Sequence, residues 1–175
     1  MSSRNNAVID LSATVIIRQN VPAVFRYISN LSLDKTWRKE IIRTIVKGPF
    51  FGLNSIAVEH ACLSKKVADH QTSFVCTTYT ANRLIAYESL PENRYWQQAI
   101  RQVEQTLNGH TRLVYTLRFD ASLVTYALGF WLPRFLVTYY TKTTMKKYLR
   151  NVKHILEAPA VTGAGLQTQA VRSVQ

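Results

Sequence analysis

Cysteine is scarce in this sequence, which has only Cys62 and Cys76 among its 175 residues. Two cysteines cannot build a disulfide framework, and none of the four histidines lies at a zinc-ligand spacing from either of them. We therefore expect no structural metal site. Because the strands that carry the two cysteines would hold them too far apart to bond, we expect both to be reduced residues of the core.

Acidic residues are also few. The chain has 10 Asp and Glu residues against 22 Lys and Arg residues, which gives a formal charge of +12 at pH 7. The surface potential is therefore positive over much of the molecule, which favours acidic or phosphate-bearing partners over basic ones.

Long apolar runs are missing as well. The first twelve residues are polar and lack the apolar run of a secretory signal. The longest apolar stretch, 123–140, is interrupted by Gly129, Pro133 and Arg134 and is too short to span a bilayer. We expect a cytoplasmic protein. Since 47% of the residues are apolar and 18% charged, the length fits one globular domain.

The beginning of the chain predicts a strand followed by two short helices. Apolar and polar residues alternate from Val8 to Arg18, as in a half-buried strand. Asn20 stands where an N-cap belongs and a proline follows in the first turn, so a short helix is expected from Val21 to Asn30. A second helical piece, from Asp34 to Lys39, would bury Trp37.

Six further strands and one long helix follow. The strand-like runs are Ile41 to Lys47, Ser55 to Leu63, Thr72 to Tyr79, Leu84 to Ser89, Tyr95 to Leu107 and Thr111 to Asp120. A turn is expected at 48–52. A helical period from Pro133 to Glu157 predicts an amphipathic helix, and 158–175 has the composition of a disordered tail, so the domain should span 1–157.

The turn between the last two strands decides which side chains face inward. Asn108 and Gly109 favour a two-residue type I′ turn, which would pair Leu107 with His110. Three polar side chains would then point into the interior as the polar end of a cavity: Gln98, Gln102 and Glu104. A bulge would reverse this parity and place Val103 and Leu107 inside instead, and the sequence leaves both alternatives open.

The long helix has small residues in its first half. Stepping back by three and four residues from Met145 reaches Thr141, Thr138 and Val137, which are smaller than the residues near the helix end. A cavity is therefore predicted beneath the first half of the helix. Bulky side chains from the sheet filling that space are the alternative.

The order of these elements, and the residues themselves, resemble the START-like, polyketide cyclase/dehydrase (SRPBCC) superfamily. The matching segments are VPAVFRYI at 21–28 with Trp37 downstream, GPFFG at 48–52, NRLIAY at 82–87, GHTRLVY at 109–115 and LRNVKHILE at 149–157. Each segment is weak alone, but their order is fairly specific, and together they cover residues 8 to 157.

This resemblance implies an α+β helix-grip fold. A curved seven-stranded antiparallel sheet would wrap around the C-terminal helix and enclose a cavity for a hydrophobic molecule. The aromatic residues expected to contact such a ligand are Trp37, Tyr87, Trp96 and Tyr115. The superfamily includes cyclases, lipid carriers and ribosome-associated factors, and the fold does not select among them.

Catalytic motifs are not evident in the sequence. It has no Gly-rich phosphate loop, no nucleophile elbow and no close pair of carboxylates, and we expect no cofactor. A polyketide cyclase or aromatase would need an acid or base in the cavity, for which Glu104 and Tyr115 are the candidates. The leading hypothesis is instead a protein that carries or sequesters a hydrophobic small molecule or lipid.

The region around the start of the long helix combines aromatic and basic residues. Phe130 and Trp131 lie in the apolar segment 127–133, and Arg134 begins a helix rich in lysine. This pattern is typical of contact with an anionic membrane surface. A solvated helix face, a ribosome or RNA partner, and a Phe130 and Trp131 that fold back onto the sheet are the alternatives.

Overall fold

The structure, a computed structural model, describes residues 8–48 and 52–158. Its strands are β1 (Val8–Ile17), β2 (Ile41–Lys47), β3 (Ile56–Ala61), β4 (His70–Thr80), β5 (Leu84–Ser89), β6 (Gln97–Gln105) and β7 (Thr111–Asp120). The helices are α1 (Val21–Ser29), η1 (Leu31–Thr36), α2 (Ser122–Leu128) and α3 (Arg134–Glu157). The expected elements are confirmed, and α2 is an addition that the sequence patterns did not predict.

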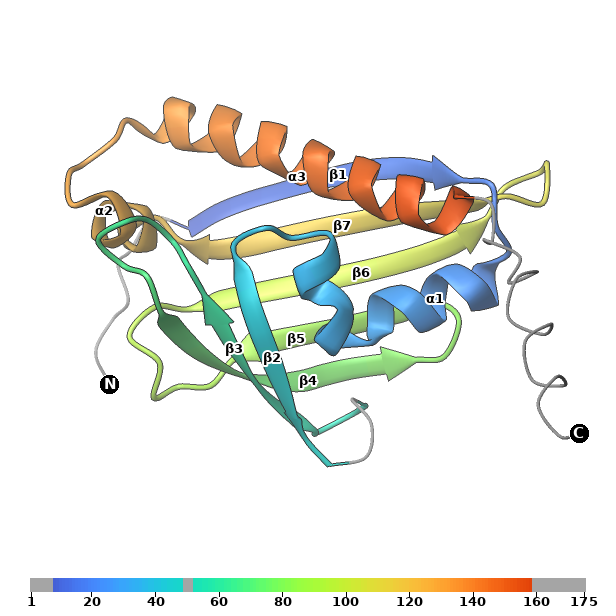
Figure 1. Ribbon diagram of the computed structural model, residues 1–175, viewed down its shortest axis with the longest axis horizontal. Helices are drawn as coiled ribbons and strands as arrows, with labels where there is room; N and C mark the ends of the chain where they lie inside the picture. Colours follow the sequence, from blue (N-terminus) through green and yellow to red (C-terminus); the bar gives the residue numbers. More distant parts are fainter. Residues whose placement is uncertain (1–7, 49–51, 159–175) are drawn as a thin grey trace, which may run out of the picture.

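The seven strands form one antiparallel sheet in the order β1-β7-β6-β5-β4-β3-β2 (Figure 1). Helix α3 lies along β1, whereas α1 packs against β6 and η1 against β2. We call the sheet face that these helices cover the inner face. The α+β helix-grip architecture is therefore confirmed, with the long helix over the β1 side of the sheet.

Local signals explain the two elements after β1. The Asn20 side chain accepts a hydrogen bond from the Ala23 amide at 2.9 Å and so caps α1. Asn30 caps η1 in the same way, accepting from the Ser32 amide at 3.1 Å. The second helical piece is a 3-10 helix that begins and ends three residues earlier than predicted, and it leaves Trp37 buried behind it.

The interior consists of two apolar clusters. The larger one joins α1, η1 and the second half of α3 to the sheet and includes Phe25, Leu149 and Val152. The smaller one lies between α2, the start of α3 and the sheet, and it includes Phe119 and Val137. Leu11 and Leu117 pack against both clusters but are themselves only partly buried.

The hairpin between β6 and β7 differs from the favoured expectation. Thr106 donates its amide to the His110 carbonyl at 2.8 Å, and Gly109 donates to Thr106 at 3.0 Å, which closes a three-residue loop with Gly109 at φ 74°. Val103 therefore pairs with Leu113, and Val103 is buried. The prediction of a two-residue turn is wrong, and the bulge alternative holds for Val103 but not for the fully exposed Leu107.

Other expectations need correction or fall elsewhere. Cys76 is a buried free thiol as predicted, but Cys62 is exposed, because it lies just beyond the end of β3. The predicted turn at 48–52 and the predicted tail fall largely on residues 49–51 and 159–175, outside the described residues. Within the described residues, no helix has the length and hydropathy that a bilayer crossing requires.

Candidate functional site

A buried arginine occupies the centre of the inner face. Arg101 on β6 is 1% exposed, and it pairs with the Asp34 carboxylate of η1, with 2.9 Å between Nη1 and Oδ1. It also donates to the Ile28 carbonyl at 2.5 Å and to the Tyr87 hydroxyl at 2.6 Å. Asp34 is fully buried. Because a buried charge needs a partner, this pair fixes η1 and the end of α1 to the sheet.

Three aromatic rings surround the Arg101 guanidinium. Its carbon lies 4.9 Å from the ring centre of Trp37, 5.1 Å from that of Tyr87 and 5.7 Å from that of Tyr115. These distances are those of cation–π contacts. The structure thus brings together three of the four aromatic residues predicted to contact a ligand, but their rings pack on Arg101, so the centre of the fold is filled by protein.

A second charged group borders this centre. Arg38 donates to Glu59 of β3 at 2.9 Å and to Glu40 at 3.0 Å, and it contacts Asp34 at 3.2 Å. The Tyr148 hydroxyl of α3 donates to Glu40 at 2.5 Å. These ion pairs connect η1, β3 and α3 across the inner face.

Burial sets the protonation states of the phenols here. It raises the pKa of Tyr87 and of Tyr115, although Arg101 and Arg38 act in the opposite direction. Burial also raises the pKa of Tyr148, and the neighbouring Glu40 carboxylate raises it further. All three hydroxyls therefore stay protonated at neutral pH and can donate hydrogen bonds, whereas none can serve as a base.

Next to the filled centre lies a strip of the inner face that is incompletely covered. Leu11 and Leu117 pair across β1 and β7, and Ala99 of β6 continues their row. Leu11 and Leu117 remain partly exposed although they face inward, as does Gln97 beside them. Gln97 reaches the Thr72 hydroxyl at 3.4 Å. We call Leu11, Leu117 and Gln97, together with the buried Ala99 beside them and Thr141 on the inward side of α3, the open strip.

Helix α3 explains why the open strip is incompletely covered. Val137 and Met145 are buried on its inward face, and Thr141, four residues from each, shares that face but is only partly buried. Thr138 is also half-buried. Thr141 is much smaller than Met145 one turn later and, like Val137 one turn earlier, leaves the helix short of side-chain volume here. Both predicted threonines thus lie where the first half of α3 passes the sheet.

Four of the predicted ligand-contact residues lie on the opposite, outer face, so the prediction that they line an interior cavity is wrong. They are Trp96, Gln98, Gln102 and Glu104. The indole of Trp96 donates to Glu88 at 2.6 Å, Gln98 accepts from Arg118 at 3.1 Å, and Glu104 pairs with Arg112 at 2.8 Å. The three-residue hairpin loop is the physical reason, because it sends the even-numbered residues of β6 outward.

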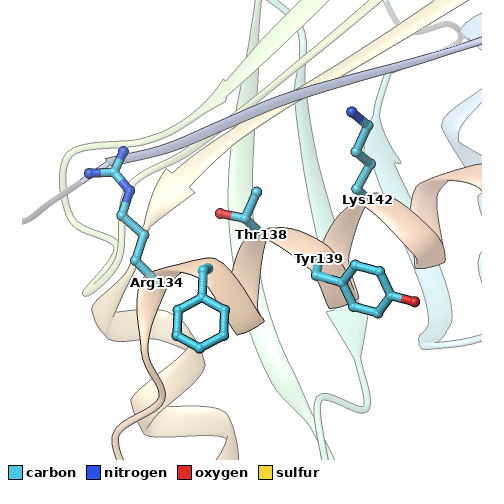
Figure 2. Close-up of a pocket in the computed structure, with 5 residues that line it drawn as sticks. Arg134, Thr138, Tyr139 and Lys142 are labelled. Atoms are coloured by element: carbon cyan, nitrogen blue, oxygen red, sulfur yellow. The ribbon is translucent and has the colours of Figure 1, made fainter.

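The start of α3 carries an open groove on the surface. The groove has a volume of about 670 Å³ and is lined by Arg134, Phe135, Thr138, Tyr139 and Lys142. Figure 2 shows Arg134, Thr138 and Lys142 pointing to one side of α3 and the Tyr139 ring projecting from another. Sequence reasoning missed Phe135 and Tyr139, although their spacing from Val137 already places them away from the inward face.

The potential metal-ligating side chains do not cluster in the described part of the chain. Among residues 8–48 and 52–158, no group of three or more His, Cys, Asp or Glu side chains is placed to hold a metal ion. Arg101 and Arg38 are paired with carboxylates, and among the described residues Arg101 Nε and Trp37 Nε1 are buried without a hydrogen-bond partner, so what the arrangement offers chemically is mainly apolar surface with a few hydrogen-bonding groups.

No protein-family model matches the sequence, and no curated protein matches it either. Solved structures do match. A START superfamily protein from Mycobacterium smegmatis is 13% identical, with a TM-score of 0.66 over 85% of this chain and 97% of that chain. A protein from Deinococcus radiodurans is 13% identical, with a TM-score of 0.58 over 85% and 95% of the two chains.

A third similar structure is the di-domain ARO/CYC BexL from the BE-7585A biosynthetic pathway. It is 16% identical, with a TM-score of 0.60 over 87% of this chain, and the match spans 51% of BexL. This chain therefore corresponds to about half of that protein. At these identities the likeness concerns the fold.

Proposed function

Because the chain has the START-like, helix-grip fold, we propose that it binds a small apolar molecule or a lipid chain at the open strip, between Thr141 of α3 and the β1–β7–β6 part of the sheet. The observation that carries this proposal is that Leu11 and Leu117, two inward-facing leucines, stay partly exposed beneath the helix. Apolar side chains on the inner face of a sheet are ordinarily buried, and a bound apolar molecule would cover these two.

The chemistry of the open strip limits what could bind there. The accessible part of its base is Leu11 and Leu117, which offer only dispersion contacts and apolar surface, and Ala99 beside them is buried. The partly exposed Gln97 supplies an amide group at one end, where it contacts the buried Thr72 hydroxyl. The ion pairs of Arg101 and Arg38 are already satisfied by carboxylates. The proposed ligand is therefore mainly apolar, with one polar end that accepts or donates a hydrogen bond.

The filled centre of the fold argues for this position over the middle of the sheet. A ligand placed over Tyr87 and Tyr115 would have to displace Arg101 from its buried ion pair, which is costly. Binding at the open strip leaves that pair intact. Trp37, Tyr87 and Tyr115 then act as the wall that borders the ligand rather than as its main contacts.

BexL is described as an ARO/CYC protein, but the inner face of this chain favours a binding protein over an enzyme of that kind. A cyclase needs an acid or base that reaches the substrate, and Glu104, the candidate carboxylate, lies on the outer face in an ion pair with Arg112. Tyr115 remains on the inner face, but its raised pKa leaves it able only to donate a hydrogen bond. We therefore propose carriage or sequestration, without a chemical step.

The proposal can be tested by filling the open strip. Thr141→Leu adds apolar volume at the position where α3 is short of it, so it should reduce binding of the neutral dye N-phenyl-1-naphthylamine at least about tenfold without lowering the thermal midpoint. Thr143→Leu is the matched control, because Thr143 lies on the outward side of the helix and contacts the Tyr139 carbonyl. Dye fluorescence and thermal denaturation are measured on the same samples.

A companion measurement uses the molecule that the protein itself retains. Native mass spectrometry of the purified chain, followed by organic extraction, should recover a hydrophobic compound from the wild type and much less from the Thr141→Leu variant. Equal dye binding by both threonine variants would show that the open strip is not the site. Failure of the wild type to bind the dye or to retain any compound would overturn the proposed function.

A further inference from the structure

Five exposed aromatic side chains surround the start of α3. Phe130 and Trp131 lie in the connection from α2, and Phe135, Tyr139 and Tyr140 lie in the first two turns of the helix. Trp131 is 72% exposed, and Tyr139 and Tyr140 are each 73% exposed. We call these five residues the aromatic patch. Phe130 and Trp131 do not fold back onto the sheet, which rules out the alternative raised by the sequence.

The backbone holds the aromatic patch in place. Gly129 ends α2 in the left-handed conformation, with φ 79°, and donates its amide to the Thr125 carbonyl at 2.8 Å. Arg134 then fixes the beginning of α3 to β1 by donating to the Val8 carbonyl at 2.9 Å. The connection between these two anchors presents its aromatic residues outward, so their exposure follows from the fold.

Cations flank the aromatic patch on the same helix. Lys142 and Lys146 are exposed and follow the aromatic residues along α3. The Lys142 side chain points to the side of the helix that Arg134 occupies, away from the Tyr139 ring (Figure 2). The helix contains no acidic residue before Glu157 at its end. The net charge of +12 gives the surrounding surface the same sign. The face therefore combines apolar and amphipathic rings with positive charge and has no carboxylate to repel an anion.

We propose that this face of α3 docks the protein on an anionic lipid bilayer. Tyrosine and tryptophan favour the interface between headgroups and acyl chains, and phenylalanine favours the acyl boundary. Lysine and arginine beside them bind lipid phosphates and anionic headgroups. The groove between Arg134 and Lys142 would admit part of a headgroup or acyl chain. The aromatic residues gather at the start of α3, where they could enter the interface, and the lysines that follow them could contact the headgroups.

Nucleic acid is the other polyanion that a charge of this size would attract. A single-stranded nucleic acid is held by aromatic residues on which bases stack between flanking cations. Here Phe130 and Phe135 lie with the tyrosines at the start of α3, and the exposed lysines lie beyond them. The two phenylalanines have no polar group that could hydrogen-bond at a hydrated nucleic-acid surface. This segregation favours a layered partner such as a bilayer over an extended strand.

The docking proposal does not depend on a ligand at the open strip, and its test uses vesicles alone. Vesicles of phosphatidylcholine are compared with vesicles that contain a third of phosphatidylserine, and bound protein is measured by co-sedimentation. The full chain should bind the anionic vesicles and not the neutral ones. Binding should weaken steeply as salt shortens the Debye length.

Two pairs of variants separate the aromatic from the charged contribution. Trp131→Ser with Phe135→Ser should nearly abolish vesicle binding. Lys142→Gln with Lys146→Gln should weaken it by about 10- to 30-fold at low salt. The matched charge control is Arg26→Gln with Lys35→Gln, two exposed cations on α1 and η1, which remove the same charge elsewhere. The apolar control is Leu107→Ser, at the exposed hairpin loop.

Several outcomes would overturn the proposal. Equal weakening by the two charge pairs would mean that net charge alone drives binding. Wild-type levels of binding by the serine variant, with its thermal midpoint unchanged, would remove the aromatic patch from the contact. If the full chain binds polyuridylate but not vesicles, the partner is nucleic acid, and if it sediments as a dimer that the serine variant dissociates, the patch is an interface between copies.

Discussion

The Asp34 carboxylate is expected to be the most sensitive single position for stability. It is fully buried and is shared by Arg101, whose Nη1 lies 2.9 Å away, and Arg38, whose Nη1 lies 3.2 Å away. Asp34→Asn keeps the volume and one acceptor oxygen, but it removes the negative charge that compensates Arg101 and replaces the second acceptor oxygen with an NH₂ donor facing the guanidinium. An uncompensated buried charge is the consequence.

Removing one partner of a buried ion pair costs about 3–5 kcal/mol. A domain of this size has a free energy of unfolding of roughly 5–15 kcal/mol, so the loss is a large part of the total. For a chain of about 150–250 residues, each kcal/mol lowers the thermal midpoint by roughly 2–4 °C. We therefore expect Asp34→Asn to lower the midpoint by roughly 6–20 °C.

Arg101→Met gives the comparison that makes this reasoning specific. Methionine removes the charge but leaves Asp34 paired with Arg38, so the destabilisation should be smaller than that of Asp34→Asn. The double variant should cost less than the sum of the two, because no charge is then left unpaired at this position. Urea denaturation followed by circular dichroism measures all three. A midpoint of Asp34→Asn within about 2 °C of the wild type would refute the assignment.

Two further predictions concern the two ends of the inner face. Burial lowers the pKa of His70 below its ordinary 6.5, so on acidification the unfolded chain binds a proton at His70 more readily than the folded chain does. The contribution of His70 to stability is therefore present above pH 6.5 and is lost as the pH falls. Thermal midpoints between pH 7.5 and 5 should therefore fall less in His70→Gln than in the wild type, and equal slopes would contradict this. Leu149→Ala should cost roughly 2–5 kcal/mol, because Leu149 is buried against the sheet, whereas Tyr140→Ala, at an exposed position, should cost almost nothing.

The order of the seven strands and the long helix, and the bounds of several strands, followed from the sequence because local patterns and tertiary burial agree there. The β2, β5 and β7 strands have the predicted bounds, and the inward residues of β1 are those of its apolar alternation. The signals at Asn20 and at the start of α1 are local and operate as expected. Where each residue preference matches the face it occupies, a single sequence is sufficient.

The candidate site was harder to predict because its central residue breaks the usual rule for charge. Arg101 has the parity of the buried Ala99 and Val103, which was the available signal, but an isolated arginine is ordinarily assigned to the solvent. Its partner, Asp34, lies 67 residues away, and no local pattern connects the two. The inward position of Arg101 became possible only because η1 brings a carboxylate to meet it.

The β6–β7 hairpin shows how burial decided between two registers, and it yields a sharp prediction. A two-residue Asn108-Gly109 turn with Leu107 paired to His110 would bury Gln98, Gln102 and Glu104 at about 1–3 kcal/mol each, which far exceeds the preference for that turn. The chain keeps Val103 inside by looping out Leu107, which is fully exposed.

Deleting Leu107 should therefore restore the favoured turn without changing the register. Thr106 and His110, already joined by a 2.8 Å hydrogen bond, would then be connected by Asn108 and Gly109 alone, in the type I′ conformation that these residues prefer. The deletion also removes an exposed apolar side chain, so the thermal midpoint should stay the same or rise. Replacing Gly109 with alanine in the wild type should lower the free energy of unfolding by roughly 1 kcal/mol, because φ is 74° at this position. If the deletion lowers the free energy of unfolding by more than about 2 kcal/mol, the three-residue turn itself, and not the burial of the β6 and β7 side chains, sets the register.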